Sequence, residues 1–137
     1  MNWKLVFLLS LFGLAMAFAT VFAIPGNIEL LVWLPIFVVC AVIIAKRAPG
    51  KFFLHGFFVS LVNSVWVTSA HELFFDDYIA RHAQEAEMTK GVPLAPRLLM
   101  VIMGPLIGVV FGLVIGVLSI IATKIFKKPA PVAPAAA

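Results

Sequence analysis

Acidic and histidine side chains gather in one stretch of the sequence, between residues 71 and 87. They are His71, Glu72, Asp76, Asp77, His82, Glu85 and Glu87. Such side chains bind a divalent cation when three or four of them converge, but a single helix seldom brings together more than two. Phe75 also stands where the zinc-protease motif would need its second histidine. We therefore predict a solvated face without a metal. The alternative is an outer cation-binding or docking cluster of Glu72, Asp76, His82 and Glu85.

A second set of polar side chains lies inside the preceding apolar run. Ser60, Asn63, Ser64, Thr68 and His71 follow one another at intervals of three, one, four and three residues, which places them on one helical face. In a membrane such a face points into a helix bundle and away from lipid. The amide of Asn63 predicts an interhelical hydrogen bond worth about 1 kcal/mol. Polar contact between helices is the simpler interpretation, and the lining of a polar path or small-ligand pocket is the alternative.

Glycines recur at four-residue intervals near the carboxyl end. Gly104, Gly108, Gly112 and Gly116 lie on one face of a helix, where they form a groove that another backbone can approach closely. Packing within the chain is the simpler interpretation, and Gly13 and Ala17 offer a matching surface of small residues. Self-association into an oligomer or pore is the alternative.

The sequence holds no catalytic motif. It has no phosphate loop, no serine nucleophile in a glycine elbow and no pair of thiols. Cys40 is the single cysteine, which excludes an internal disulfide. We predict neither an enzyme nor a bound cofactor.

The composition indicates that these segments belong to a membrane protein. Of 137 residues, 64% are hydrophobic and 12% are charged, too few charges for the surface of a soluble domain. Four apolar runs, at about 5–24, 28–45, 52–75 and 98–125, approach or exceed the roughly 20 residues that cross a bilayer. We predict an all-α integral membrane protein, a four-transmembrane-helix bundle forming one domain over residues 1–128. Residues 76–90 should extend the third helix as an amphipathic segment, and 129–137 should be a disordered tail rich in proline and alanine.

The first apolar run has a second interpretation, as a cleaved signal peptide. Lys4 precedes it, and small residues near its end resemble a cleavage site. Its apolar core is longer than the roughly 7 to 15 residues typical of a signal peptide. We therefore predict a helix that remains in the protein.

The distribution of basic residues predicts the orientation. With the amino terminus in the cytoplasm, seven of the ten basic residues fall inside: Lys4, Lys46, Arg47, Lys51, Lys124, Lys127 and Lys128. The other three, Arg81, Lys90 and Arg97, fall outside with all six acids. Because Lys and Arg favour cytoplasmic loops, both termini should be cytoplasmic. The basic residues flank apolar runs and make no binding face, so nucleic acid is not an expected partner.

The layout resembles that of small uncharacterised bacterial inner-membrane proteins of the domain-of-unknown-function kind. The resemblance rests on four spans and three segments: KRAPGKFF at 46–53, FFDDYIARH at 74–82 and GPLIGVVFGLVIG at 104–116. It implies a multi-pass protein of the bacterial inner (plasma) membrane and transfers no catalytic residue.

We expect the function to be structural, in assembly through a glycine-zipper helix. Its partners would be the lipid bilayer and a second copy or another membrane protein. The alternative is a small oligomeric transporter or pore lined by the polar face of the third helix.

Overall fold

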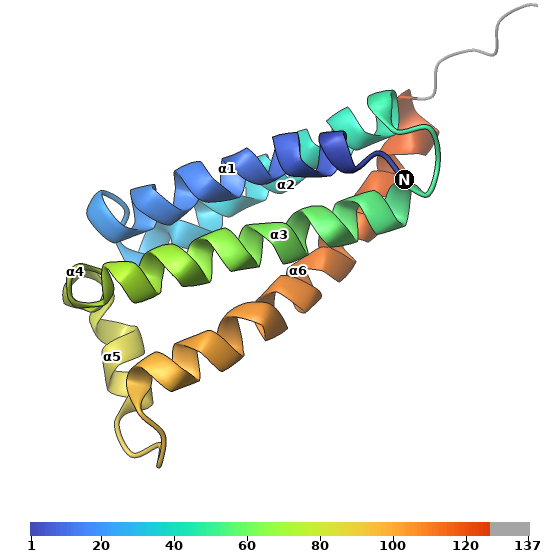
Figure 1. Ribbon diagram of the computed structural model, residues 1–137. Helices are drawn as coiled ribbons and strands as arrows, with labels where there is room; N and C mark the ends of the chain where they lie inside the picture. The colour runs from blue at the N-terminus through green and yellow to red at the C-terminus, as the bar shows by residue number, and fades with distance from the viewer. Residues whose placement is uncertain (127–137) are drawn as a thin grey trace, which may run out of the picture.

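The chain is all-helical in the part that the computed structural model describes, residues 1–126 (Figure 1). Its helices are α1 (Trp3–Phe22), α2 (Gly26–Arg47), α3 (Phe52–Leu73), α4 (Phe75–Arg81), α5 (Ala83–Thr89) and α6 (Pro96–Phe126). In this part of the chain α1, α2, α3 and α6 are long and apolar enough to cross a membrane. The predicted all-α bundle with four candidate spans is confirmed, and these helices indicate a membrane protein. The expected tail at 129–137, and Lys127 and Lys128, lie outside the described residues.

Helix α3 is the centre of the bundle. It packs against α6 and α1, and α2 packs mainly against α6. The contact between α3 and α6 is close because Gly56 has no side chain: a Cβ there would lie 2.7 Å from the carbonyl oxygen of Ile115. Lipid gives apolar helices no hydrophobic drive to associate, so such close backbone packing contributes to holding the helices together.

The amino terminus is tied to the start of α3. Asn2 caps α1 by accepting a hydrogen bond on its side-chain Oδ1 from the backbone N–H of Leu5, at 3.1 Å. Its own backbone N–H donates to Nε2 of His55, at 2.9 Å. His55 is fully buried. These bonds satisfy donors that the first turn of a helix cannot pair internally.

The two ends of the bundle are formed by different parts of the chain. The amino terminus and the end of α6 lie at one end, with α4 and α5 at the other (Figure 1). At the first end the ammonium group of Lys46 lies 5.3 Å from the centre of the Phe126 ring, so the carboxyl ends of α2 and α6 are adjacent.

The segment after α3 differs from the predicted continuous extension. Helix α3 ends at Leu73, and the backbone leaves the helical conformation at Phe74 and again at His82, giving the short helices α4 and α5. At these two breaks the chain changes direction, and the segment folds back across the end of the bundle (Figure 1). His82 is buried there, where a solvated face was expected, and Tyr78 is buried beside it.

Candidate functional site

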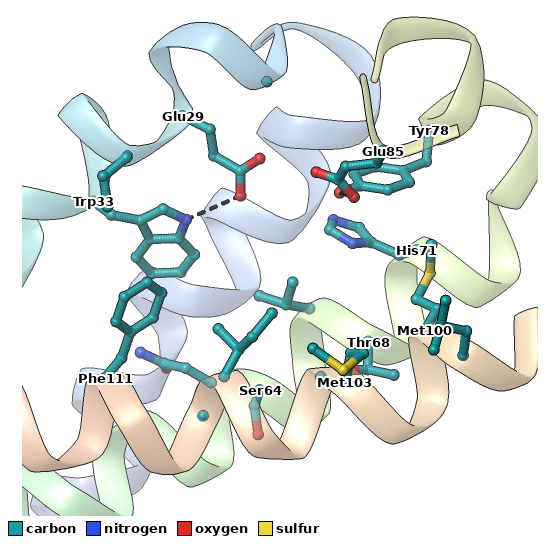
Figure 2. Close-up of a pocket in the computed structure, with 18 of the residues that line it drawn as sticks. Glu29, Trp33, Ser64, Thr68, His71, Tyr78, Glu85, Met100, Met103 and Phe111 are labelled. Carbon is teal, nitrogen blue, oxygen red and sulfur yellow. Dashed lines mark hydrogen bonds between the residues drawn. The ribbon is translucent and has the colours of Figure 1, made fainter. Parts of the chain in front are cut away.

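A cavity of about 610 Å³ lies between α2, α3 and α6 and reaches α4 and α5 (Figure 2). The polar residues predicted to share one face of α3 all line it: Ser60, Asn63, Ser64, Thr68 and His71. The α3 stripe therefore faces a space within a single chain.

Most of the cavity wall is apolar. Helix α2 contributes Trp33 and Phe37, and α6 contributes Met100, Met103 and Phe111. The rings of Phe37 and Phe111 lie 5.2 Å apart, which closes the wall between α2 and α6. Figure 2 shows Met103 and Phe111 along α6, with Trp33 opposite them on α2. Such a surface suits an apolar ligand body.

The hydroxyls of the α3 stripe are mostly engaged by backbone carbonyls. Ser60 donates to the carbonyl of Gly108 on α6, at 2.8 Å, and Ser64 donates within its own helix to Leu61, at 2.8 Å. Asn63 differs from the prediction. Its Oδ1 is buried without a hydrogen-bond partner among the described residues and lies beside Gly13 of α1. This oxygen thus packs closely against Gly13, where the sequence predicted an interhelical hydrogen bond of the Asn63 amide.

Two carboxylates from different helices stand at the polar end of the cavity. Glu29, in the first turn of α2, accepts a hydrogen bond on Oε1 from the indole of Trp33, at 3.1 Å (Figure 2). Glu85, on α5, accepts a hydrogen bond on Oε2 from the hydroxyl of Tyr78, at 2.6 Å. Both carboxylates are half-buried, and each is held by an aromatic donor.

Three aromatic side chains stack beside these carboxylates. The centre of the Tyr78 ring lies 3.7 Å from the centre of the His71 ring and 4.0 Å from that of the His82 ring, and the ring planes are nearly parallel. Burial raises the pKa of Tyr78, and the hydrogen bond to the Glu85 carboxylate raises it further. The phenol therefore stays protonated and remains a hydrogen-bond donor to Glu85.

His82 completes a cluster with the two carboxylates. One ligand atom each from Glu29, His82 and Glu85 lies within 4.8 Å of the other two. The structure thus brings His82 and Glu85 together, as the sequence suggested, and adds Glu29 from α2 as the third member. Sequence reasoning left out Glu29 because 53 residues separate it from His82. The available signal was that the predicted topology places both at the same end.

The other two members of the predicted cluster lie apart from it. Glu72 faces α6, where Nη1 of Arg97 lies 3.9 Å from Oε2 of Glu72 and donates to its backbone carbonyl, at 3.1 Å. Asp76 is exposed. The guanidinium of Arg97 also lies 4.6 Å from the ring centre of Phe75, so this basic residue holds the start of α6 against the α3–α4 junction.

All four glycines of the α6 repeat face α3. A Cβ at Gly108 would lie 2.5 Å from that of Ser64, one at Gly112 would lie 2.9 Å from the Phe57 ring, and one at Gly116 would lie 2.7 Å from the Phe53 ring. A Cβ at Gly104 would meet Thr68. Across the bundle, Gly13 meets Asn63 of α3, and Ala17 is buried. The sequence predicts that these two small-residue surfaces pair with each other, whereas the α6 glycines and Gly13 each contact α3.

Comparisons with known proteins assign no family. No protein-family model, no curated protein and no solved structure matches this chain. The functional argument therefore rests on the residues of the cavity.

Proposed function

We propose that this chain is a membrane protein that binds an amphiphilic small molecule in the cavity between α2, α3 and α6. One observation carries the proposal: the apolar walls of a 610 Å³ cavity lead to a polar end formed by Glu29, His71, Tyr78 and Glu85. Sites for drug-sized ligands have volumes of about 300–1,000 Å³ and combine apolar walls with a few convergent polar groups.

The lining indicates how such a ligand would lie. Its apolar body would pack between Phe37 on α2 and Met103 and Phe111 on α6, with its polar head at the carboxylates. Met103 and Ile107 line the cavity although they are 42% and 47% exposed on a helix apolar enough to cross a membrane. The cavity wall is thus continuous with a lipid-facing surface, and this supports entry of the ligand from the bilayer.

The other functions considered from the sequence have less support. Self-association through the α6 glycines would need a free groove, and their open sides face α3. A pore between several copies would need the polar face of α3 to point outward, and its residues line a cavity within one chain. A homo-oligomer or another membrane partner remains a prediction.

A bulky side chain in the cavity tests the proposal. Val67 lines the cavity, whereas Val65 on the same helix is 58% exposed toward lipid. Native mass spectrometry of the full chain, released from membrane particles, should show a non-covalent adduct of small mass. The adduct should persist in Val65→Trp and be lost in Val67→Trp. No adduct on the unchanged chain, or an equal adduct on both variants, would refute the proposal.

For the location we propose the bacterial inner membrane, with both termini in the cytoplasm. The support is the concentration of basic residues at one end of the bundle. Lys4 near the amino terminus, Lys46 and Arg47 at the end of α2, and Lys51 before α3 all lie at this end, with Lys124 near the end of α6. Lys and Arg favour the cytoplasmic side of a membrane. The resemblance in layout to bacterial inner-membrane proteins remains a prediction.

A further inference from the structure

We propose that Glu29, His82 and Glu85 bind one zinc ion at the polar end of the cavity. One ligand atom from each lies within 4.8 Å of the other two. Zinc binds histidine nitrogen and carboxylate oxygen at about 2.0–2.2 Å, so two ligand atoms of a tetrahedral site are about 3.3 Å apart. Nε2 of His82 and Oε2 of Glu29 lie 3.3 Å apart. A small movement of the Glu85 carboxylate would bring its oxygen to zinc-binding distance as the third ligand.

The environment of His82 provides independent support. Its Nδ1 lies 2.9 Å from the backbone carbonyl of Tyr78. A carbonyl only accepts hydrogen bonds, so Nδ1 is the donor, and in the neutral ring Nε2 presents a lone pair. His82 is 2% exposed, and its Nε2 is buried without a hydrogen-bond partner among the described residues. The approach to Glu29 is close but lacks hydrogen-bond geometry. This lone pair and the Glu29 oxygen both accept, so a positive charge between them is favourable.

The remaining polar atoms of the three side chains are held in place. Trp33 donates to Oε1 of Glu29, and the hydroxyl of Tyr78 donates to Oε2 of Glu85. With Nδ1 of His82 held by a carbonyl, each side chain has one atom fixed and one atom left for a metal. Metal ligands in proteins are characteristically oriented by such outer partners, which also set the tautomer of a ligating histidine.

Charge and access also suit a divalent cation. Two carboxylates and a neutral imidazole balance a charge of +2, whereas without a cation the carboxylates face each other in a half-buried site. The side chain of Glu29 is 19% exposed, which leaves a path from water. Three protein ligands leave a fourth position for water or a ligand. The zinc site stands on these three side chains and does not depend on what the cavity binds.

Zinc binding to the full chain in lipid nanodiscs tests the site. After treatment with a chelator, titration of Zn²⁺ against a chromogenic competitor should show one saturable site per chain. Glu85→Gln preserves shape and removes the ligand charge, so it should weaken Zn²⁺ binding by at least about tenfold. The matched control is Glu87→Gln on the same helix, because Glu87 is exposed and paired with Lys90. It should bind Zn²⁺ as the unchanged chain does.

A spectroscopic measurement on the unchanged chain does not depend on whether a variant folds. X-ray absorption of the zinc-loaded protein should show one imidazole among oxygen ligands at about 2.0–2.2 Å. Absence of saturable binding, equal affinity in Glu85→Gln, or a zinc environment without imidazole would each overturn the site. Zinc binding is measured without a cavity ligand, so this proposal and the proposed function can fail separately.

Discussion

Thr20 and His71 meet under the polar end of the cavity, although 51 residues separate them. Oγ1 of Thr20 lies 2.9 Å from Nε2 of His71, and the same hydroxyl lies 3.0 Å from the carbonyl of Ala17. A hydroxyl has one hydrogen. When that hydrogen is donated to Ala17, Nε2 of His71 is the donor to Thr20. This contact joins α1 to α3 and fixes the ring on which Tyr78 stacks.

Removing this contact should destabilise the fold. Thr20→Val replaces the buried hydroxyl with a methyl group of similar size and leaves Nε2 of His71 without a partner. A buried group that loses its hydrogen bond costs about 1–3 kcal/mol. We expect a lower midpoint of thermal unfolding in detergent. Thr123→Val is the control, because its hydroxyl bonds to Ile120 of its own helix near the end of α6. Equal midpoints for the two variants would contradict the prediction.

Tyr78→Phe should loosen α5. The change keeps the stacked ring but removes the hydrogen bond to Glu85, and none of the α5 residues is buried. A hydrogen bond to a charged group contributes about 1.5 kcal/mol or more. We therefore expect amide hydrogen exchange over 83–89 to accelerate by about tenfold. In Glu87→Gln, which removes an exposed ion pair, exchange should change little. Unchanged exchange in Tyr78→Phe would show that other contacts hold α5.

The contact between α3 and α6 should not tolerate one added methyl group at Gly56. In Gly56→Ala the new Cβ would lie 2.7–2.8 Å from backbone atoms of Ile115 and Gly116. Backbone atoms cannot move away by a change of rotamer, as a side chain can. Overpacking of this kind costs about 1–3 kcal/mol. Denaturant titration in mixed micelles should show the loss. Val114→Ile is the control, since it adds one carbon to a side chain of α6 that is 42% exposed. A destabilisation no larger than that of this control would argue against close backbone packing.

Single-cysteine labelling tests the proposed orientation. Cys40 is the only cysteine and is fully buried, so the unchanged chain should react little with a membrane-impermeant maleimide. Glu87→Cys should label in intact cells, and Arg47→Cys only after the membrane is opened. Both positions are exposed: Glu87 lies on α5, and Arg47 is the last residue of α2, whose end is next to that of α6 at the opposite end of the bundle from α5 (Figure 1). Labelling of both variants in intact cells would rule out the orientation.

Several features could be predicted from the sequence because they depend on neighbours within one helix. A stretch of about 20 apolar residues has few alternatives to a spanning helix, since backbone groups in hydrocarbon must pair within the segment. The intervals between Ser60, Asn63, Ser64, Thr68 and His71 reflect the helical period, so their common face was predictable. The common face of the glycines was predictable for the same reason.

The partners of each face depend on how the helices rotate and pack, and the helical period carries no information about this. In the folded chain the α6 glycines contact α3, where Ser64 and Thr68 lie opposite Gly108 and Gly104. The breaks at Phe74 and His82 occur without glycine or proline at either position. They follow from burial of Tyr78 and His82 against the bundle, a tertiary contact that outweighs local helix preference. Only this folding back brings His82 and Glu85 to Glu29, because Glu29 lies on α2 and the other two lie in the α4–α5 segment, which meets α2 at one end of the packed chain.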